Sequence, residues 1–286
     1  SAGHLLARRA LLAGAAAIAP ALLAGQTAFA KKLKAPADAS GAASAATPSG
    51  GGVEVPKPRT KVDLAGRRLV AIGDVHGDFL QAMKALELAK VMDATGHWVG
   101  GTTVLVQVGD ILDRGDSELA IMRKFRSLAK EAAAAGGDLI MINGNHEIMN
   151  VMGDFRYATK GAYGECARYV EKKKAAADAA AAAAAGGDDA NKENVPPATE
   201  VPADVNAGIR ARQQLFLPGG EMALKMAANP TVLQVGDTVF AHAGITQDHV
   251  EYGFERLNNE VAAWMAGKTS KPPKQVLEEK GVVWTR

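Results

Sequence analysis

The sequence predicts an α/β fold, in the broad sense that includes α+β, and three observations support this prediction. Three short segments of β-branched and other apolar residues each run directly into a glycine-containing polar loop. Segments with the apolar spacing of an amphipathic helix lie between these expected strands. Glycines follow the helical segments, so that strands and helices alternate along the chain as β-α-β-α-β.

The three expected strands each deliver polar residues at their carboxyl ends. The strands are 68–72, 103–108 and 139–142, and the loops that follow them are 73–78, 109–115 and 143–147. Between them, helices are predicted at 79–92, closed by Gly96, and at 119–128, ending at Gly136-Gly137. Ligands of open α/β sheets bind at the carboxyl edge of the strands, so the three loops are expected to form one site.

A β-hairpin is predicted further along the chain. Residues 232–235 and 238–241 are apolar and flank Gly236-Asp237, a two-residue turn that contains glycine. The second strand of this hairpin leads directly into His242.

The first 30 residues have the features of a signal or transit segment. Arg8 and Arg9 precede an apolar stretch of alanine and leucine, and an Ala-Phe-Ala pattern at 28–30 is typical of a cleavage site. The paired arginines are compatible with twin-arginine export. The apolar stretch is too short and too rich in alanine for stable membrane insertion.

The remaining chain is expected to contain one folded domain with an insertion. Residues 31–62 are rich in Ala, Ser, Gly, Pro and Lys without periodicity, which indicates a disordered linker. The domain is predicted at 63–286. Within it, 172–204 contains a polyalanine run and Pro196-Pro197, which indicates a low-complexity insertion on a surface loop. A helical arm is one option there, because alanine is the strongest helix former.

Charge and cysteine content exclude several functions. The formal net charge is +2 and the basic residues are scattered, so no nucleic-acid partner is expected. Cys166 is the single cysteine, and no internal disulfide is possible. A cysteine-based phosphatase needs an arginine six residues after its nucleophile, but that position holds Lys172. Cys166 is therefore expected to be an ordinary buried residue.

The loops carry residue types that bind divalent metal ions. Asp74 and His76 are two residues apart, which places both side chains on one side of an extended segment. Asp110 follows the next strand, and a carboxylate has two oxygens with which to bridge two metals. Asn145 offers an amide oxygen, and His242 offers the nitrogen that the second metal lacks.

Three further loop residues are suited to phosphate chemistry. Arg114 presents the planar fork that binds phosphate oxygens, and Asn145 is a second candidate phosphate contact. His146 neighbours a candidate metal ligand, where it can protonate a leaving oxygen. Asp113 is expected to orient the other ring nitrogen of His146.

These motifs resemble the phosphoprotein phosphatase family of the calcineurin-like metallophosphoesterases. Asp-Arg-Gly at 113–115, and Glu147 after Asn-His, are typical of that branch. The run 145–157 is similar to the Shewanella-like protein phosphatases, and the ending Val-Val-Trp-Thr-Arg at 282–286 also fits that group.

The resemblance implies a four-layer fold of two mixed β-sheets flanked by helices, and two divalent metal ions, Mn²⁺ first and Fe or Zn as options. It implies Asp74, His76 and Asp110 at one metal, and Asp110 with Asn145 and His242 at the other. It also implies a further histidine ligand downstream of the Trp-x-Arg region. The 286 residues contain no such histidine, so the expected domain is truncated at its C-terminus.

The predicted function is hydrolysis of phosphate monoesters, with phosphoserine or phosphothreonine proteins as substrates and a hydroxide activated by two metals as the nucleophile. A dinucleoside polyphosphate hydrolase and a non-catalytic phosphoprotein-binding module are the alternatives. The group resembled includes plastid enzymes, and alanine-rich insertions suit a GC-rich algal genome. The chloroplast, with the thylakoid lumen as one compartment, is therefore expected, and a bacterial periplasm is the alternative. The sequence gives no oligomeric state.

Overall fold

The computed structural model describes residues 54–184, 205–277 and 279–286. The strands are β1 (Lys61–Val62), β2 (Leu69–Ile72), β3 (Val104–Gln107), β4 (Asp138–Met141), β5 (Val232–Val235) and β6 (Thr238–Ala241). The helices are α1 (Phe79–Leu88), α2 (Glu118–Ala134), α3 (Asn145–Val151), α4 (Lys160–Ala184), α5 (Val205–Phe216), α6 (Glu221–Ala227), α7 (Gln247–Tyr252) and α8 (Phe254–Met265), and a 3-10 turn covers Lys274–Val276.

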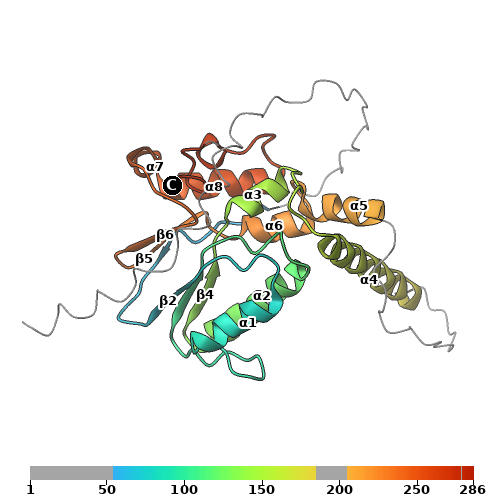
Figure 1. Cartoon of the computed structure of the whole chain (residues 1–286), viewed down its shortest axis with the longest axis horizontal. Coiled ribbons are helices and arrows are strands. Elements are labelled where there is room, and N and C mark those ends of the chain that lie inside the picture. Colours follow the sequence, from blue (N-terminus) through green and yellow to red (C-terminus); the bar gives the residue numbers. More distant parts are fainter. Residues whose placement is uncertain (1–53, 185–204, 278) are drawn as a thin grey trace, which may run out of the picture. The chain divides into compact units, whose positions relative to one another are not determined.

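Two small sheets flanked by helices confirm the expected fold class (Figure 1). Strands β2, β3 and β4 form a parallel sheet in that order, and β1, β5 and β6 form a sheet that mixes parallel and antiparallel pairs. Only the second sheet is mixed among the described residues, whereas the resemblance implied two mixed sheets. The first sheet is parallel because α1 and α2 each return the chain to the same edge before the next strand begins.

Side chains alternate across the strands and so define the layers. Val104, Val106 and Ile140 belong to one core between the two sheets, together with Leu233 of β5. Leu105 and its neighbours on the opposite face join a second core that contains the apolar faces of α1 and α2. The first sheet is therefore buried on both faces, as its continuous apolar strands require.

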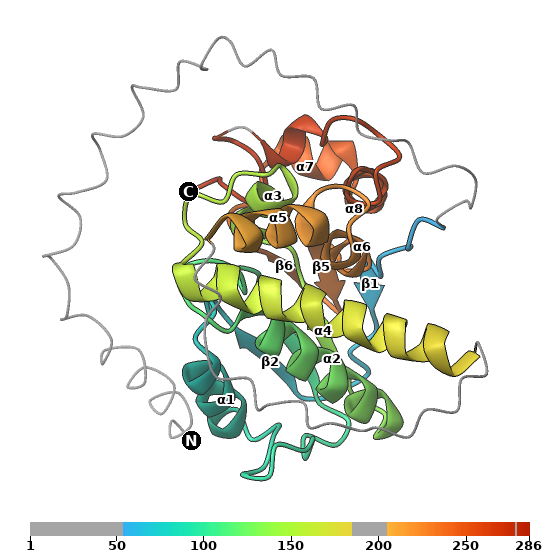
Figure 2. The same ribbon diagram turned by 90° about the vertical axis from the view of Figure 1, so that its right-hand side faces the viewer.

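Helix α8 covers the outer face of the mixed sheet. Its Asn258 is buried, accepts hydrogen bonds from the backbone N–H groups of Thr231 and Val232, and donates to the carbonyl oxygen of Val232. On the other side of the unit, α2 and α4 pack against each other, with α1 and α2 in front of the parallel sheet (Figure 2).

The folded part of the chain begins earlier than predicted. Lys61 and Val62 form β1, which pairs with β5, and Val62 is buried between the sheets. The expected linker 31–62 therefore ends too late, because two residues without helical or alternating periodicity can still add a short strand to an existing sheet edge. The expected signal segment and the linker as far as residue 53 lie outside the described residues.

Two other boundaries differ from the prediction. The first helix ends at Leu88 rather than near Met92, because Lys90 has a left-handed backbone (φ 55°) that turns the chain away. Met92 then bridges to Trp98. In the expected insertion, residues 172–184 continue α4 as a helix, and 185–204 lie outside the described residues. No helix in the described part of the chain has both the length and the apolar character needed to cross a bilayer.

Candidate metal centre and acid pair

The loops after β2, β3 and β4 meet at the carboxyl edge of the parallel sheet, as predicted. The backbone N–H groups of Val75 and His76 both donate to the carbonyl oxygen of Asp110, at 3.1 and 3.0 Å. Gly77 N–H donates to the carbonyl oxygen of Ile111 at 2.8 Å. These hydrogen bonds hold the first two loops together, so that side chains 36 residues apart share one site.

The backbone of these loops is strained at the predicted site residues. Six non-glycine residues in the described chain have positive φ, and four of them are His76 (41°), Asp110 (57°), Asp113 (68°) and Arg114 (66°). Such conformations cost free energy and persist where the surrounding structure enforces them, which is common in binding and catalytic sites.

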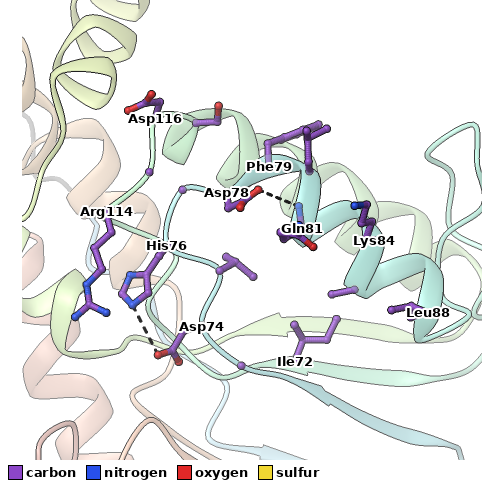
Figure 3. A pocket seen from close by; sticks show the side chains of 17 residues that line it. Ile72, Asp74, His76, Asp78, Phe79, Gln81, Lys84, Leu88, Arg114 and Asp116 are labelled. Atoms are coloured by element: carbon purple, nitrogen blue, oxygen red, sulfur yellow. Dashed lines mark hydrogen bonds and ion pairs between the residues drawn. The ribbon is translucent and has the colours of Figure 1, made fainter. Parts of the chain in front are cut away.

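Asp110 lies at the centre of three imidazole rings. Its Oδ2 atom is 3.3 Å from His242 Nε2, 3.7 Å from His76 Nε2 and 3.8 Å from His146 Nε2. Asp74 borders the same space, with one oxygen 3.8 Å from His76 Nε2 and the other 3.9 Å from His242 Nδ1. One of the two dashed lines in Figure 3 marks the contact between His76 and Asp74.

Backbone carbonyls set the tautomers of two of these rings. Nδ1 of His76 lies 2.9 Å from the carbonyl oxygen of Leu112, and Nδ1 of His242 lies 2.9 Å from that of Val108. A carbonyl oxygen only accepts, so each Nδ1 donates. The neutral ring of His76 then turns the lone pair of Nε2 toward Asp110, and Nε2 of His242 faces the same carboxylate. This second hydrogen bond is the usual support for a metal-binding histidine.

The residues present fit a divalent metal ion. Nε2 of His76 is buried, and no hydrogen-bond donor in the described residues reaches it. Its lone pair instead faces the carboxylate oxygens of Asp74 and Asp110, an arrangement that is repulsive unless a cation lies between them. Two overlapping groups of ligand atoms, each within 4.8 Å, share Asp110: one with His76 and His146, the other with Asp74 and His242.

The structure brings four of the five predicted ligands, Asp74, His76, Asp110 and His242, into mutual contact but groups them differently from the resemblance. His242 at the end of β6 lies next to Asp74 as well as Asp110. Asn145 is the first residue of α3, directly before His146, and is half-buried. The division of ligands between two metals stays a prediction.

The charges of the site shift the pKa values of its members. Burial alone would raise the pKa of Asp110, but contacts with His242 and His146 outweigh it and lower that pKa. Burial would lower the pKa of His242, but the neighbouring carboxylate of Asp110 raises it to about 9. The lowered pKa of Asp110 and the raised pKa of His242 both favour the charged forms of these two neighbouring side chains.

His146 and Asp113 form the expected pair. Nδ1 of His146 lies 2.6 Å from Oδ2 of Asp113, and both side chains are buried. On the other side of the ring, a guanidinium nitrogen of Arg114 lies 3.2 Å from Nε2 of His146. The backbone N–H of Arg114 donates to the carbonyl oxygen of Tyr157, which holds this arginine beside the site.

A cavity of about 1000 Å³ opens beside the centre (Figure 3). Asp74, His76 and Arg114 border one end, and Lys84 and Leu88 of α1 line the other. The cavity gives a large substrate access to the carboxylates and to the guanidinium.

Glu147 organises the loops, a role that was not predicted from the sequence. One carboxylate oxygen accepts the N–H groups of Asp110 and Gly144, both at 2.8 Å, and the other accepts those of Ile111 and Leu112, at 2.9 and 3.2 Å. Burial, followed by the charge of Asp110, raises its pKa to about 7. Its place in the first turn of α3 is typical of a residue that binds backbone N–H groups.

Four other polar or reactive side chains lie outside the set of predicted site residues. Arg212 of α5 is fully buried behind the acid pair and has no distinguishing sequence pattern. Arg156, in the loop after α3, is paired with Asp154. Cys166 is buried as expected, and burial raises its pKa to about 12. His249 accepts a hydrogen bond from Thr246 N–H at the start of α7.

Comparison with known proteins assigns the family. A model of the calcineurin-like phosphoesterases matches residues 67–220, more than half of the chain. Shewanella-like protein phosphatase 2 of Arabidopsis thaliana is 41% identical over 203 residues, which cover 70% of this chain and 52% of that protein. Shewanella-like protein phosphatase 1 of Plasmodium berghei (strain Anka) is 38% identical over 90 residues, which cover 32% of this chain and 25% of that protein.

The chain thus spans about half the length, or less, of these curated relatives. Among solved structures, a cold-active protein tyrosine phosphatase aligns with a TM-score of 0.58 at 21% identity, over 80% of this chain and 59% of that chain. A second structure, of the cold-active protein-tyrosine phosphatase of a psychrophile Shewanella sp., gives a TM-score of 0.54 at 22% identity, over 80% of this chain and 60% of that chain. These likenesses show a shared fold.

Proposed function

Because the chain belongs to the calcineurin-like phosphoesterase family, we propose that it is a metal-dependent phosphomonoesterase that acts on phosphoserine or phosphothreonine in proteins. One observation carries the proposal: Nε2 of His242 and Nε2 of His76 lie 3.3 and 3.7 Å from one oxygen of Asp110, beside a His146–Asp113 pair at 2.6 Å. Ligands for metal and a proton donor on one sheet edge are what phosphate ester hydrolysis requires.

The side chains divide the work of this reaction. Bound divalent ions supply a water of lowered pKa and positive charge for the phosphate oxygens. Asp74, His76, Asp110, Asn145 and His242 are the residues that hold them. Arg114 binds the phosphate in a bidentate fork, which orients the phosphorus for in-line attack, and Asn145 is proposed as a further phosphate contact.

His146 acts as the general acid. Asp113 accepts the hydrogen bond of Nδ1, so that Nε2 faces the site and delivers its proton to the departing alkoxide. The 3.2 Å contact of Arg114 with Nε2 places the phosphate-binding group next to the proton donor. No side chain is needed as a nucleophile, so no phosphoenzyme forms.

Manganese is the metal we propose, with iron and zinc as options. A set of imidazole nitrogens and carboxylate or amide oxygens suits all three ions, whereas magnesium and calcium prefer oxygen alone. The test is metal analysis of the purified protein. The metal is then removed with a chelator, each ion is added back singly, and the phosphatase activity that it restores is measured.

The substrate is tested with three compounds: a phosphoserine peptide, a phosphotyrosine peptide and diadenosine tetraphosphate. Preference for the phosphoserine peptide supports the proposal, and turnover of the dinucleotide alone would replace it. Asp110→Asn should abolish turnover. Asp138→Asn is the matched control, because Asp138 is also partly buried and ion-paired but lies at the amino end of β4, opposite the site.

The cellular location we propose is the chloroplast. The support is the signal-like segment of residues 1–30, together with the Arabidopsis thaliana relative. Expression of residues 1–62 fused to a fluorescent protein in algal cells tests this, since fluorescence outside the plastid would exclude it.

A further inference from the structure

Arg212 is a fully buried cation directly behind the predicted acid pair. It lies on α5, its side chain has no exposed surface, and its guanidinium carbon is 4.9 Å from the centre of the Phe216 ring and 5.4 Å from that of Phe155. An arginine keeps its charge under all ordinary conditions. A charge so enclosed must be satisfied by partners, because an unpaired buried ion is very costly.

The partners of Arg212 come from three different elements. Its Nη1 lies 2.6 Å from one oxygen of Glu118, at the start of α2, and its Nη2 lies 3.1 Å from Oδ1 of Asp113. Nε and Nη2 both donate to Oδ1 of Asn150, on α3, at 2.9 and 2.7 Å. The guanidinium therefore uses all three of its nitrogens within one buried cluster.

Arg212 leaves Asp113 with one available orientation. Oδ1 of Asp113 accepts from Arg212, while Oδ2 accepts from His146 Nδ1 at 2.6 Å and from Asn150 Nδ2 at 3.0 Å. Both oxygens are thus occupied on a carboxylate with no exposed surface. Rotation of Asp113 would break a charge-assisted bond to Arg212 as well as the bond that orients the ring of His146.

Arg212 also acts on the orientation of Asp113 indirectly, through Glu118 and Asn150. Glu118, which Arg212 holds by both oxygens, accepts the backbone N–H of Asp113 at 2.6 Å, where φ is 68°. Arg212 has only donors, so Asn150 must turn its amide oxygen toward the guanidinium. The amide nitrogen of Asn150 then faces Asp113 and the carbonyl oxygen of His146, at 3.0 and 2.9 Å.

Stability alone is a weak reason for this cluster. Buried ion clusters often stabilise a fold no better than apolar side chains of the same volume. The cluster instead surrounds the one carboxylate that contacts the ring of His146 through Nδ1. We propose that Arg212 is a positioning residue that holds Asp113, and through it His146, in the orientation required for proton donation. This inference rests on the proposed phosphomonoesterase function.

The test compares Arg212→Lys with the unaltered chain on two substrates. Lysine keeps the charge but loses the planar fork, so it cannot hold Asp113, Glu118 and Asn150 together. Turnover of a phosphoserine peptide, whose alkoxide leaving group needs a proton, should fall by roughly 10–100-fold. An aryl phosphate with an acidic leaving group should be affected much less. Equal losses on both substrates would mean that Arg212 serves only the fold.

A second readout does not depend on activity. The Nδ1 proton of His146 in its short bond to Asp113 should give a low-field NMR resonance, assigned by its loss in His146→Asn. Arg212→Lys should shift or broaden this resonance, and an unchanged resonance would overturn the inference. Arg126→Lys is the matched control, because this half-buried arginine of α2 donates to the carbonyl of Lys225 beside a separate cavity. It should alter neither readout.

The two readouts separate this inference from the function on which it rests. If the unaltered chain hydrolyses no phosphate ester with any metal, the proposed function fails, and the resonance alone decides whether Arg212 positions His146. If Arg212→Lys does not fold, Glu118→Gln takes its place, because it weakens the hold on Arg212 without removing the cation from the core. It should lower alkyl ester turnover selectively, and equal losses would again count against positioning.

Discussion

Replacement of Glu147 with glutamine is expected to loosen the metal-binding loops while preserving the size of the side chain. The carboxylate accepts four backbone N–H groups, two on each oxygen. Glutamine keeps one oxygen and presents an NH₂ group in place of the other. Two buried backbone N–H groups therefore lose their acceptor and face the NH₂ group of glutamine instead. The four N–H groups that Glu147 binds belong to the loop that contains Asp110 and to the loop that precedes α3.

The lost hydrogen bonds determine how much unfolding free energy Glu147→Gln is expected to lose. Each unsatisfied buried donor costs about 1–3 kcal/mol, so two cost about 2–6 kcal/mol. The raised pKa of Glu147, about 7, shows that burial and then Asp110 disfavour the ionised carboxyl, and removal of that charge offsets part of the loss. We therefore expect the lower end, about 2–3 kcal/mol of unfolding free energy, or a fall in Tm of roughly 4–12 °C.

The assay pairs stability with metal binding. Thermal unfolding and Mn²⁺ titration are measured for Glu147→Gln and for Glu165→Gln. Glu165 also accepts two backbone N–H groups, those of Leu119 and Ala120, but at the start of α2. Both variants should lose stability, whereas only Glu147→Gln should lose metal affinity, by roughly 10–100-fold. Unchanged Mn²⁺ affinity in Glu147→Gln, or an equal loss in both, would refute the reasoning.

Three further predictions concern proton transfer, metal binding and pH. His146→Asn should slow a phosphoserine peptide by about 10²–10⁴-fold and an aryl phosphate less, at unchanged metal content; equal slowing would remove His146 as the acid. Burial would lower the pKa of His242, but the carboxylate of Asp110 raises that pKa to about 9. Metal binding at pH 7 should therefore release a proton from His242, and a calorimetric heat of binding that does not depend on the buffer would contradict this. Burial would raise the pKa of Glu221, but side-chain hydrogen bonds, of which the one from Lys173 has the largest effect, lower that pKa to about 2. A depressed carboxyl pKa favours the fold above its unfolded value of 4.5 and loses that contribution as pH falls toward 2. Unfolding between these two pH values should therefore depend more steeply on pH in the unaltered chain than in Glu221→Gln, and parallel curves would contradict the linkage.

The order of elements and the place of the site could be predicted from the sequence. Apolar strand segments that end in Gly-Asp or Gly-Asn can be recognised from a few neighbouring residues, and parallel strands bring their carboxyl ends to the same edge of a sheet. For that reason Asp74, Asp110 and His146 could be placed at one edge from the sequence alone. The hairpin around Gly236 followed from an equally local signal, the turn residue between two apolar runs.

Boundaries were harder to predict, because they depend on single backbone conformations and on partners far along the chain. Lys90 ends α1 through its left-handed backbone, although the apolar spacing continues beyond it. Val62 joins a sheet only because β5, more than a hundred residues later, offers a free edge.

The sequence by itself determined which side chains meet at the sheet edge and what chemistry they are suited to, because motif spacing and strand alternation are local properties. Only the tertiary structure decided how those side chains are held. Glu147 binds N–H groups 35–37 residues away, and Arg212 reaches Asp113 across 99 residues. Such hydrogen bonds depend on the packing of α5 and α3 around a buried charge, and a carboxylate or guanidinium that makes them looks no different in sequence from one on the surface.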